Sequence, residues 1–128
     1  MITSNSEGNK LPLVILRISG IDRRFLIDTG AGMTIIKPSI VPVLNTDQMA
    51  RTFKSVGYGI GGKESTIDVP VRFNFVGVII HTVVVSENIF DSVAKSGLFI
   101  DGIIGNDILR CFASIEFDFK NEVIRFTS

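Results

Sequence analysis

Apolar and polar residues alternate with a period of two along much of the chain. One such segment runs from Ile67 to Phe75, another from Ala113 to Phe119, and a shorter one from Leu13 to Ile18. Successive side chains of a strand point to opposite faces, so each segment is predicted to be a strand with one buried face. Pro70 interrupts the first of them and indicates an edge position or a bulge, because proline cannot donate to the hydrogen-bond ladder.

Turn and helix signals complete this pattern. The pair Lys120-Asn121 predicts a turn, after which Glu122 to Phe126 reads as the returning strand of a hairpin. Helical signal is scarce: Pro38-Ser39 could open a short turn of helix, and residues 106–111 could form one or two turns after Gly105. Many short strands with glycine-rich punctuation favour a mostly β fold, either a small barrel or a closed sandwich.

Composition agrees with one folded domain. The chain has 128 residues, of which 45% are hydrophobic and 20% charged, far from the profile of a disordered chain. Residues 1–10 are polar, rich in Gly, Asn and Ser, and predict a flexible lead-in, so the domain is expected to cover residues 11–128.

Charge and hydropathy exclude several classes of partner. With 13 Lys and Arg against 13 Asp and Glu, the formal net charge is zero, which gives no basis for binding nucleic acid or an anionic membrane surface. The longest apolar runs fall well short of the roughly 20 residues of a spanning helix, and no signal peptide is visible. A single cysteine permits no internal disulfide, so a cytoplasmic location is expected.

The most informative segment is Phe25-Leu26-Ile27-Asp28-Thr29-Gly30-Ala31-Gly32. Asp28 follows three large apolar residues and precedes a tight, glycine-containing turn, which places a carboxylate at the end of a buried strand. Such an Asp is either a structural turn residue or a perturbed catalytic group, because burial is costly for a lone ionised carboxylate. Chance alone produces Asp-Thr-Gly in roughly a few per cent of chains of this length, so context has to decide.

Two further segments supply that context. Residues 57–62 hold four glycines and predict a mobile hairpin tip that could approach an extended ligand closely. An ordinary loose hairpin is the plain alternative; phosphate binding is disfavoured, since no strand-then-helix arrangement surrounds the glycines. The third segment, Ile103-Ile104-Gly105, leads into the short helix predicted at residues 106–111.

The order of these three segments resembles the retropepsin-like aspartic proteases, the single-domain relatives of pepsin, over nearly all of residues 11–126. The resemblance implies an all-β fold: a small closed barrel of the acid-protease type with one short C-terminal helix and one lobe per chain. It also implies a homodimer, because the chemistry requires two carboxylates that share a proton and each chain supplies one such Asp.

The resemblance assigns roles to individual residues. Asp28 of both chains would activate a water that attacks the scissile carbonyl of a peptide or protein substrate, with no metal and no cofactor. Thr29 would hydrogen-bond across the dyad, and Gly30 would admit the substrate backbone. The expected substrate-contacting residues are Ala31, Tyr58, Gly59, Ile60 and Gly61, the last four in a flap that closes over an extended peptide.

The chain departs from the viral pattern at two positions. Viral enzymes usually carry Asp after Asp-Thr-Gly-Ala and Arg after the later glycine, whereas here these positions are Gly32 and Asn106. The sequence therefore looks closer to the cellular and bacterial members of the family. Ala31 also lacks the hydroxyl that would stabilise an ionised Asp in pepsin-like enzymes, so a milder pH optimum than that of pepsin is expected.

Other polar residues are predicted to be structural. His81 has no second histidine or cysteine to share a metal, and Cys111 is expected to be a buried thiol. Asp101 is predicted to be a turn residue, with a smaller chance of lining the cleft as a second carboxylate. The pair Arg23-Arg24 is expected to be solvated in a turn between two strands.

Three functional hypotheses remain at this point. The favoured one is an aspartic endopeptidase. The alternative is a catalytically inactive retropepsin-like module that dimerises or binds peptides, since a fold does not guarantee activity. A small β-barrel binding protein with an accidental Asp-Thr-Gly would leave the order of the three segments unexplained.

Overall fold

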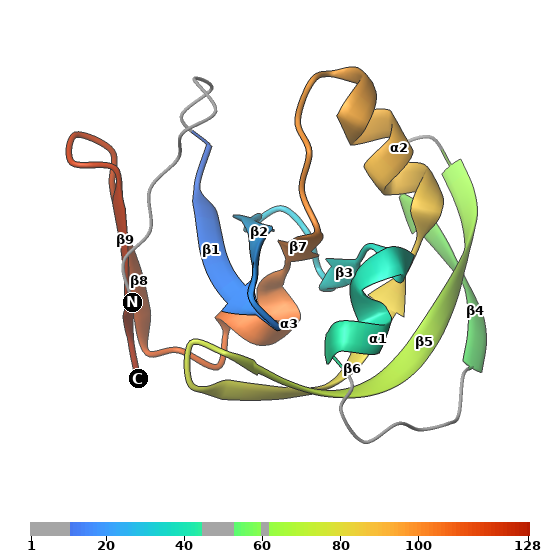
Figure 1. The fold of residues 1–128 in the computed structure, drawn as a ribbon, viewed down its shortest axis with the longest axis horizontal. Coiled ribbons are helices and arrows are strands. Elements are labelled where there is room, and N and C mark those ends of the chain that lie inside the picture. The colour runs from blue at the N-terminus through green and yellow to red at the C-terminus, as the bar shows by residue number, and fades with distance from the viewer. Residues whose placement is uncertain (1–10, 45–52, 60–61) are drawn as a thin grey trace.

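The computed structural model describes residues 11–44, 53–59 and 62–128, and within them the chain forms a curled seven-stranded sheet, a separate two-stranded sheet and a few short helices (Figure 1). The elements in chain order are β1 (Leu13–Ile18), β2 (Ile21–Ile27), β3 (Ile35–Ile36), a 3-10 turn (Pro38–Ile40), α1 (Val41–Leu44), β4 (Phe53–Gly59), β5 (Gly62–Phe75), β6 (Val78–Val85), α2 (Glu87–Lys95), β7 (Gly102–Ile104), α3 (Asn106–Leu109), β8 (Ser114–Asp118) and β9 (Val123–Thr127). The expected lead-in at residues 1–10 and the flap residues Ile60 and Gly61 lie outside the described residues.

Two tight hairpins, β1–β2 and β5–β6, contribute strands on either side of the centre of the large sheet. β1 and β2 pair through a two-residue turn in which Ser19 and Gly20 have φ values of 52° and 81°. β5 and β6 pair through Val76 and Gly77, with φ values of 50° and 90°. Positive φ at both central residues matches the right-handed twist of the flanking strands, which explains why each turn keeps a glycine.

The centre of the sheet brings distant segments together. The strand order is β1-β2-β7-β3-β6-β5-β4, with β2 parallel to β7 and β3 antiparallel to it. Ile27 lies beside Ile104 at the end of the parallel pair. Because both strands end at the same edge, the residues that follow them, Asp28 and Gly105, emerge side by side.

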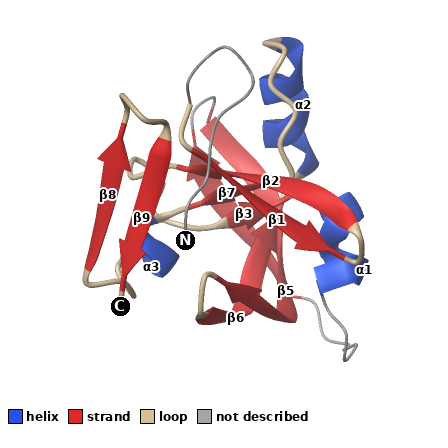
Figure 2. Cartoon of the chain, turned by 60° about the vertical axis from the view of Figure 1, so that its left-hand side comes forward, coloured by secondary structure: helices blue, strands red, loops and turns tan. Residues whose placement is uncertain are grey.

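Phenylalanines connect the two-stranded sheet of β8 and β9 to the large sheet. Phe25 and Phe75 are fully buried, and their ring centroids lie 6.2 Å apart. Phe126 of β9 meets Phe75 edge-on at 5.9 Å and lies 4.9 Å from Phe112. Although Figure 2 shows β8 and β9 standing to one side of the main sheet, they share its hydrophobic core.

The sequence analysis did not predict α2. Its apolar residues Ile89, Phe90 and Val93 pack in a second core cluster with Leu13, Ile100 and Ile103. Signals for the helix are present in the sequence: a serine before its first residue, apolar positions at i, i+1 and i+4, and a glycine two residues beyond its end. In the structure Ser86 is extended and Gly97 has a φ of 86°. The signals were missed because the apolar stretch is short and lies between strands.

Most of the other expectations are confirmed. The fold is mostly β, with the large sheet curled into a half-barrel. Pro70 stands where the register between β5 and β6 shifts, as expected for a bulge. Short helices begin at Pro38 and Asn106. None of the described helices has the length and apolar character needed to span a lipid bilayer.

Candidate functional site

Asp28 is the first residue after β2, which is held between β1 and β7 in the large sheet. Its backbone N–H donates to the Ile104 carbonyl at 3.0 Å, one step beyond the parallel pairing of the two strands. Ile27 immediately before it is 4% exposed, whereas Asp28 itself is only partly buried. The strand therefore fixes the backbone of Asp28 firmly and leaves its carboxylate within reach of solvent.

The turn after Asp28 folds back on the carboxylate. The Gly30 N–H donates to Oδ1 of Asp28 at 2.9 Å, and the Ala31 N–H donates to the Asp28 carbonyl at 3.1 Å. A Cβ atom on Gly30 would lie 3.2 Å from Oδ1, a tighter approach than most side chains allow. Glycine at this position thus lets the backbone come close enough to hold the carboxylate.

The first turn of α3 holds the same loop through hydrogen bonds. The backbone N–H groups of Asn106 and Asp107 donate to the carbonyls of Ala31 and Gly32 at 2.8 and 3.2 Å. The Asn106 side chain also donates, from Nδ2 to the Thr29 carbonyl at 2.7 Å. N–H groups at the start of a helix have no partner within it, so the loop satisfies them while α3 holds the loop in place.

Thr34 anchors the far end of the loop and is 1% exposed. Its hydroxyl donates to Oδ1 of Asp107 at 2.7 Å and accepts from the Gly105 N–H at 3.0 Å. Gly105 itself has no room for a side chain, because a Cβ atom would lie 2.6 Å from the Met33 carbonyl oxygen. The loop therefore packs directly against the backbone of the strand-to-helix connection.

Asp101 does not join Asp28. Its Oδ2 accepts the Arg24 N–H at 2.9 Å, and the register pairs Gly102 with Phe25, so it lies roughly 13 Å back along the strand from Asp28. The prediction of a structural role for Asp101 agrees with this placement. The described part of the chain places a single carboxylate, that of Asp28, in the turn.

Two predictions about other polar residues are wrong. Arg23 and Arg24 belong to β2 rather than to a turn, and the Arg23 side chain is only 20% exposed because it pairs with Asp101 at 3.6 Å. Cys111 is exposed rather than buried, and its Sγ donates to the Asp107 carbonyl at 3.7 Å. The end of α3 faces outward there, so the thiol does not reach the core. His81 lies exposed on β6.

The glycine-rich segment is the hairpin of β4 and β5. In its register Tyr58 lies opposite Lys63 and Gly59 opposite Gly62. The predicted hairpin is confirmed in its two arms, while Ile60 and Gly61 at its tip lie outside the described residues. Within the described ranges, no group of three or more His, Cys, Asp or Glu side chains could hold a metal ion.

Sequence reasoning missed how Thr34, Asn106 and Asp107 support the site. The sequence analysis identifies Asn106 only as a departure from the viral pattern and assigns no role to Thr34. One signal was available: Thr34 is a polar residue inside an otherwise apolar run that follows the Asp-Thr-Gly turn. Its partners lie more than 70 residues away in the sequence, so no local pattern identifies them.

Comparisons with known proteins agree with this fold. Among solved structures, the EIAV protease complexed with the inhibitor HBY-793 matches with a TM-score of 0.58 and 24% sequence identity, over 85% of this chain and 92% of that chain. At this identity the likeness shows the fold alone. A comparison with curated proteins finds no match.

The family comparison covers most of the chain. The model of the retroviral aspartyl protease family matches residues 9–114, which include the Asp28 turn, the β4–β5 hairpin and Ile103-Ile104-Gly105. Neither comparison separates viral from cellular members, so the closer likeness to cellular and bacterial members stays a prediction. The chain belongs to the retroviral aspartyl protease family.

Proposed function

We propose that this chain is an aspartic endopeptidase that works as a homodimer, with residues 11–128 as its protease domain. Asp28 from each of two chains forms the catalytic dyad on the two-fold axis. One carboxylate acts as a base toward a bound water, and its protonated partner polarises the scissile carbonyl and then supplies a proton to the leaving nitrogen. In this proposal Thr29, which is exposed beside Asp28, hydrogen-bonds across the axis.

The observation that carries this proposal is the way Asp28 is held. Its backbone is fixed by β7, its Oδ1 accepts the Gly30 N–H, and its loop is clamped by α3. A carboxylate that only forms a turn does not require hydrogen bonds from a segment about 76 residues away in the chain. Geometry fixed before substrate arrives is what acid–base catalysis requires.

The substrate in this proposal is an extended peptide. Gly30 and Ala31 border the carboxylate, and the β4–β5 hairpin that carries Tyr58, Gly59, Ile60 and Gly61 closes over the peptide. Closure excludes water from the dyad. A second hypothesis, an inactive module that dimerises or binds peptides, differs from the protease only in lacking turnover.

The test combines mass in solution with turnover. Sedimentation over a concentration series, with and without a statine-type peptide inhibitor, is expected to show a dimer that the inhibitor stabilises, because a transition-state mimic binds best where two carboxylates meet. Asp28→Asn should abolish cleavage of a fluorogenic peptide library while the dimer persists. A monomer unaffected by inhibitor would contradict the protease, and a dimer without turnover would favour the inactive module.

The pH dependence provides a second check on the active site. Because Ala31 offers no hydroxyl to the ionised carboxylate, the rate maximum is expected in the mildly acidic range rather than where pepsin works. The measurement is kcat/KM across the acid range with the best-cleaved peptide. A maximum below about pH 3 would contradict this expectation.

A further inference from the structure

We propose that Asn106 is a positioning residue for the Asp28 carboxylate and that it acts through the peptide bond between Thr29 and Gly30. This inference rests on the proposed function, because it assigns a role in the same site. Two hydrogen bonds form one chain: Nδ2 of Asn106 donates to the Thr29 carbonyl at 2.7 Å, and the Gly30 N–H donates to Oδ1 of Asp28 at 2.9 Å. The link between them is the covalent peptide that carries both that carbonyl and that N–H.

Peptide geometry makes the connection strict. The peptide unit is planar and trans, so its carbonyl and its N–H point in opposite directions. A hydrogen bond that fixes the carbonyl of Thr29 therefore also fixes the direction of the Gly30 N–H. Asn106 aims that N–H at the carboxylate without touching it. Rotation of this peptide plane, which an exposed turn would otherwise permit, breaks both hydrogen bonds at once.

Asn106 is itself held on both sides. Its N–H donates to the Ala31 carbonyl at 2.8 Å, and its own carbonyl accepts both the N–H and the Nε of Arg110 at 3.1 Å. The side chain needs only its short stem to reach Thr29. Its amide orientation follows from the partner, since a carbonyl can accept only from the nitrogen.

The chemical consequence concerns the orientation of the carboxylate. A hydrogen bond to a peptide carbonyl polarises the unit and strengthens its N–H as a donor, as in other hydrogen-bond chains. A stronger donor at Oδ1 holds the carboxylate in one orientation. An uncharged residue supplies this support, at the position where the resemblance to viral enzymes leads one to expect arginine.

Two substitutions separate positioning from packing. Asn106→Ala removes the donor, and Asn106→Asp keeps the shape but presents oxygens to the Thr29 carbonyl. An acidic side chain in the first turn of a helix is favourable for the helix itself, so Asn106→Asp should leave α3 intact. Asn121→Ala is the matched control, because Asn121 also donates an exposed side-chain amide hydrogen bond, to Asp118 at 2.9 Å, in the β8–β9 hairpin.

The experiment measures kcat, KM and amide hydrogen exchange on the dimeric protein. With a cleavable fluorogenic peptide, Asn106→Ala should lower kcat/KM about 10-fold, mainly through kcat, and Asn106→Asp at least as much. The Gly30 amide should exchange about 10-fold faster in both and unchanged in Asn121→Ala.

The outcomes distinguish this inference from the proposed function. Wild-type activity in Asn106→Asp, or an unchanged Gly30 exchange rate in Asn106→Ala, would overturn the positioning role. Equal losses of kcat/KM in Asn106→Ala and Asn121→Ala would also overturn it, because they would reflect stability alone. A wild-type protein that cleaves nothing while Gly30 exchange still depends on Asn106 would refute the protease and leave the positioning role standing.

Discussion

At the scale of single residues, Gly105 shows how a backbone contact dictates an amino acid. A Cβ atom there would lie 2.6 Å from the Met33 carbonyl oxygen and 2.8 Å from that of Ala31. Both are backbone atoms in the loop that carries Asp28, so they cannot move aside as a flexible side chain would. Any side chain at position 105 must push the loop away from α3.

Gly105→Ala is therefore expected to lower the free energy of unfolding by about 2 to 3 kcal/mol, measured by urea denaturation at fixed protein concentration. The matched control is Gly32→Ala in the same loop, where a Cβ atom meets nothing within 4 Å, and a change within about 0.5 kcal/mol is expected. Equal stability of the two variants would show that the loop yields easily, contrary to the packing described above.

Residue-scale predictability follows the range of each contact. The turn at Asp28 could be predicted because an apolar run, a carboxylate and two glycines are adjacent in the sequence. The bond from Asn106 to Thr29 joins residues 77 apart, and the pairing of Arg23 with Asp101 joins β2 to the residue that precedes β7. No local pattern carries such information, which is why Arg23 was wrongly expected to be solvated.

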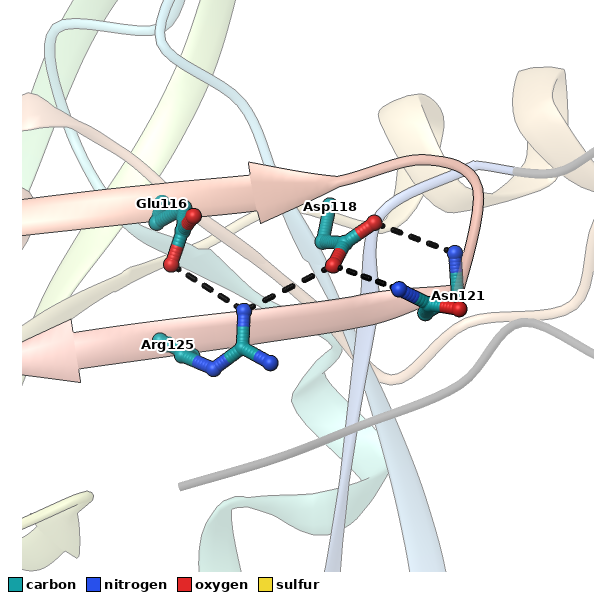
Figure 3. A network of polar contacts seen from close by, with 4 residues as sticks. All are labelled: Glu116, Asp118, Asn121 and Arg125. Atoms are coloured by element: carbon teal, nitrogen blue, oxygen red, sulfur yellow. Dashed lines mark hydrogen bonds and ion pairs between the residues drawn. The ribbon is translucent and has the colours of Figure 1, made fainter.

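At the scale of elements, the β8–β9 hairpin has its own polar network (Figure 3). Asp118 accepts from the side chain and the backbone N–H of Asn121 at 2.9 and 3.1 Å, and Arg125 lies 3.6 Å from it while also bonding Glu116. The hydrogen bonds from Asn121 lower the pKa of Asp118, with a smaller contribution from the charge of Arg125. The ionised Asp118 carboxylate thus links Asn121 in the turn to Arg125 in β9.

The sign of the pH effect follows from this lowered pKa. An Asp whose folded-state pKa lies below its ordinary value contributes stability above that ordinary value and loses it as the pH falls through the folded-state pKa. In Asn121→Ala, the Asp118 pKa measured by NMR titration should therefore rise toward its ordinary value. An unchanged titration would mean that Arg125 alone sets the pKa, and Arg125→Gln, which removes the charge, would then be the variant that moves it.

Element-scale prediction succeeded where periodicity was long and failed where it was short. The nine residues from Ile67 to Phe75 keep an apolar residue at every second position despite Pro70, and Val71, Phe73 and Phe75 are buried as the period requires. In α2, nine residues give little more than two turns, so its apolar face has only a few members. Tertiary contacts with Leu13 and Ile103, which no local pattern reveals, stabilise that helix.

At the scale of the whole molecule, the site exists because of strand order. β2 and β7 are neighbours although more than 70 residues separate them, and only this pairing brings the Asp28 turn to the start of α3. Sequence patterns predicted several of the strands, but parallel pairing of distant segments depends on the global fold. Resemblance to a family supplied what periodicity could not.

The folded unit extends beyond the residues that the family model matches. The family match ends at residue 114, where β8 begins, yet Ile124 is 3% exposed and the ring of Phe126 packs against Phe75 and Phe112. Removing residues 115–128 would expose these core partners. A chain ending at residue 114 should therefore lose cooperative thermal unfolding by calorimetry, because a deletion of this size removes more than the few kcal/mol that stabilise a small domain.

Phe119→Ser is the control for this deletion. Phe119 is 72% exposed, and a change in the free energy of unfolding within about 1 kcal/mol is expected. If the shortened chain melted cooperatively at the temperature of the full chain, the hairpin would be an appendage, and the phenylalanine contacts across the two sheets would contribute little to the fold that presents Asp28.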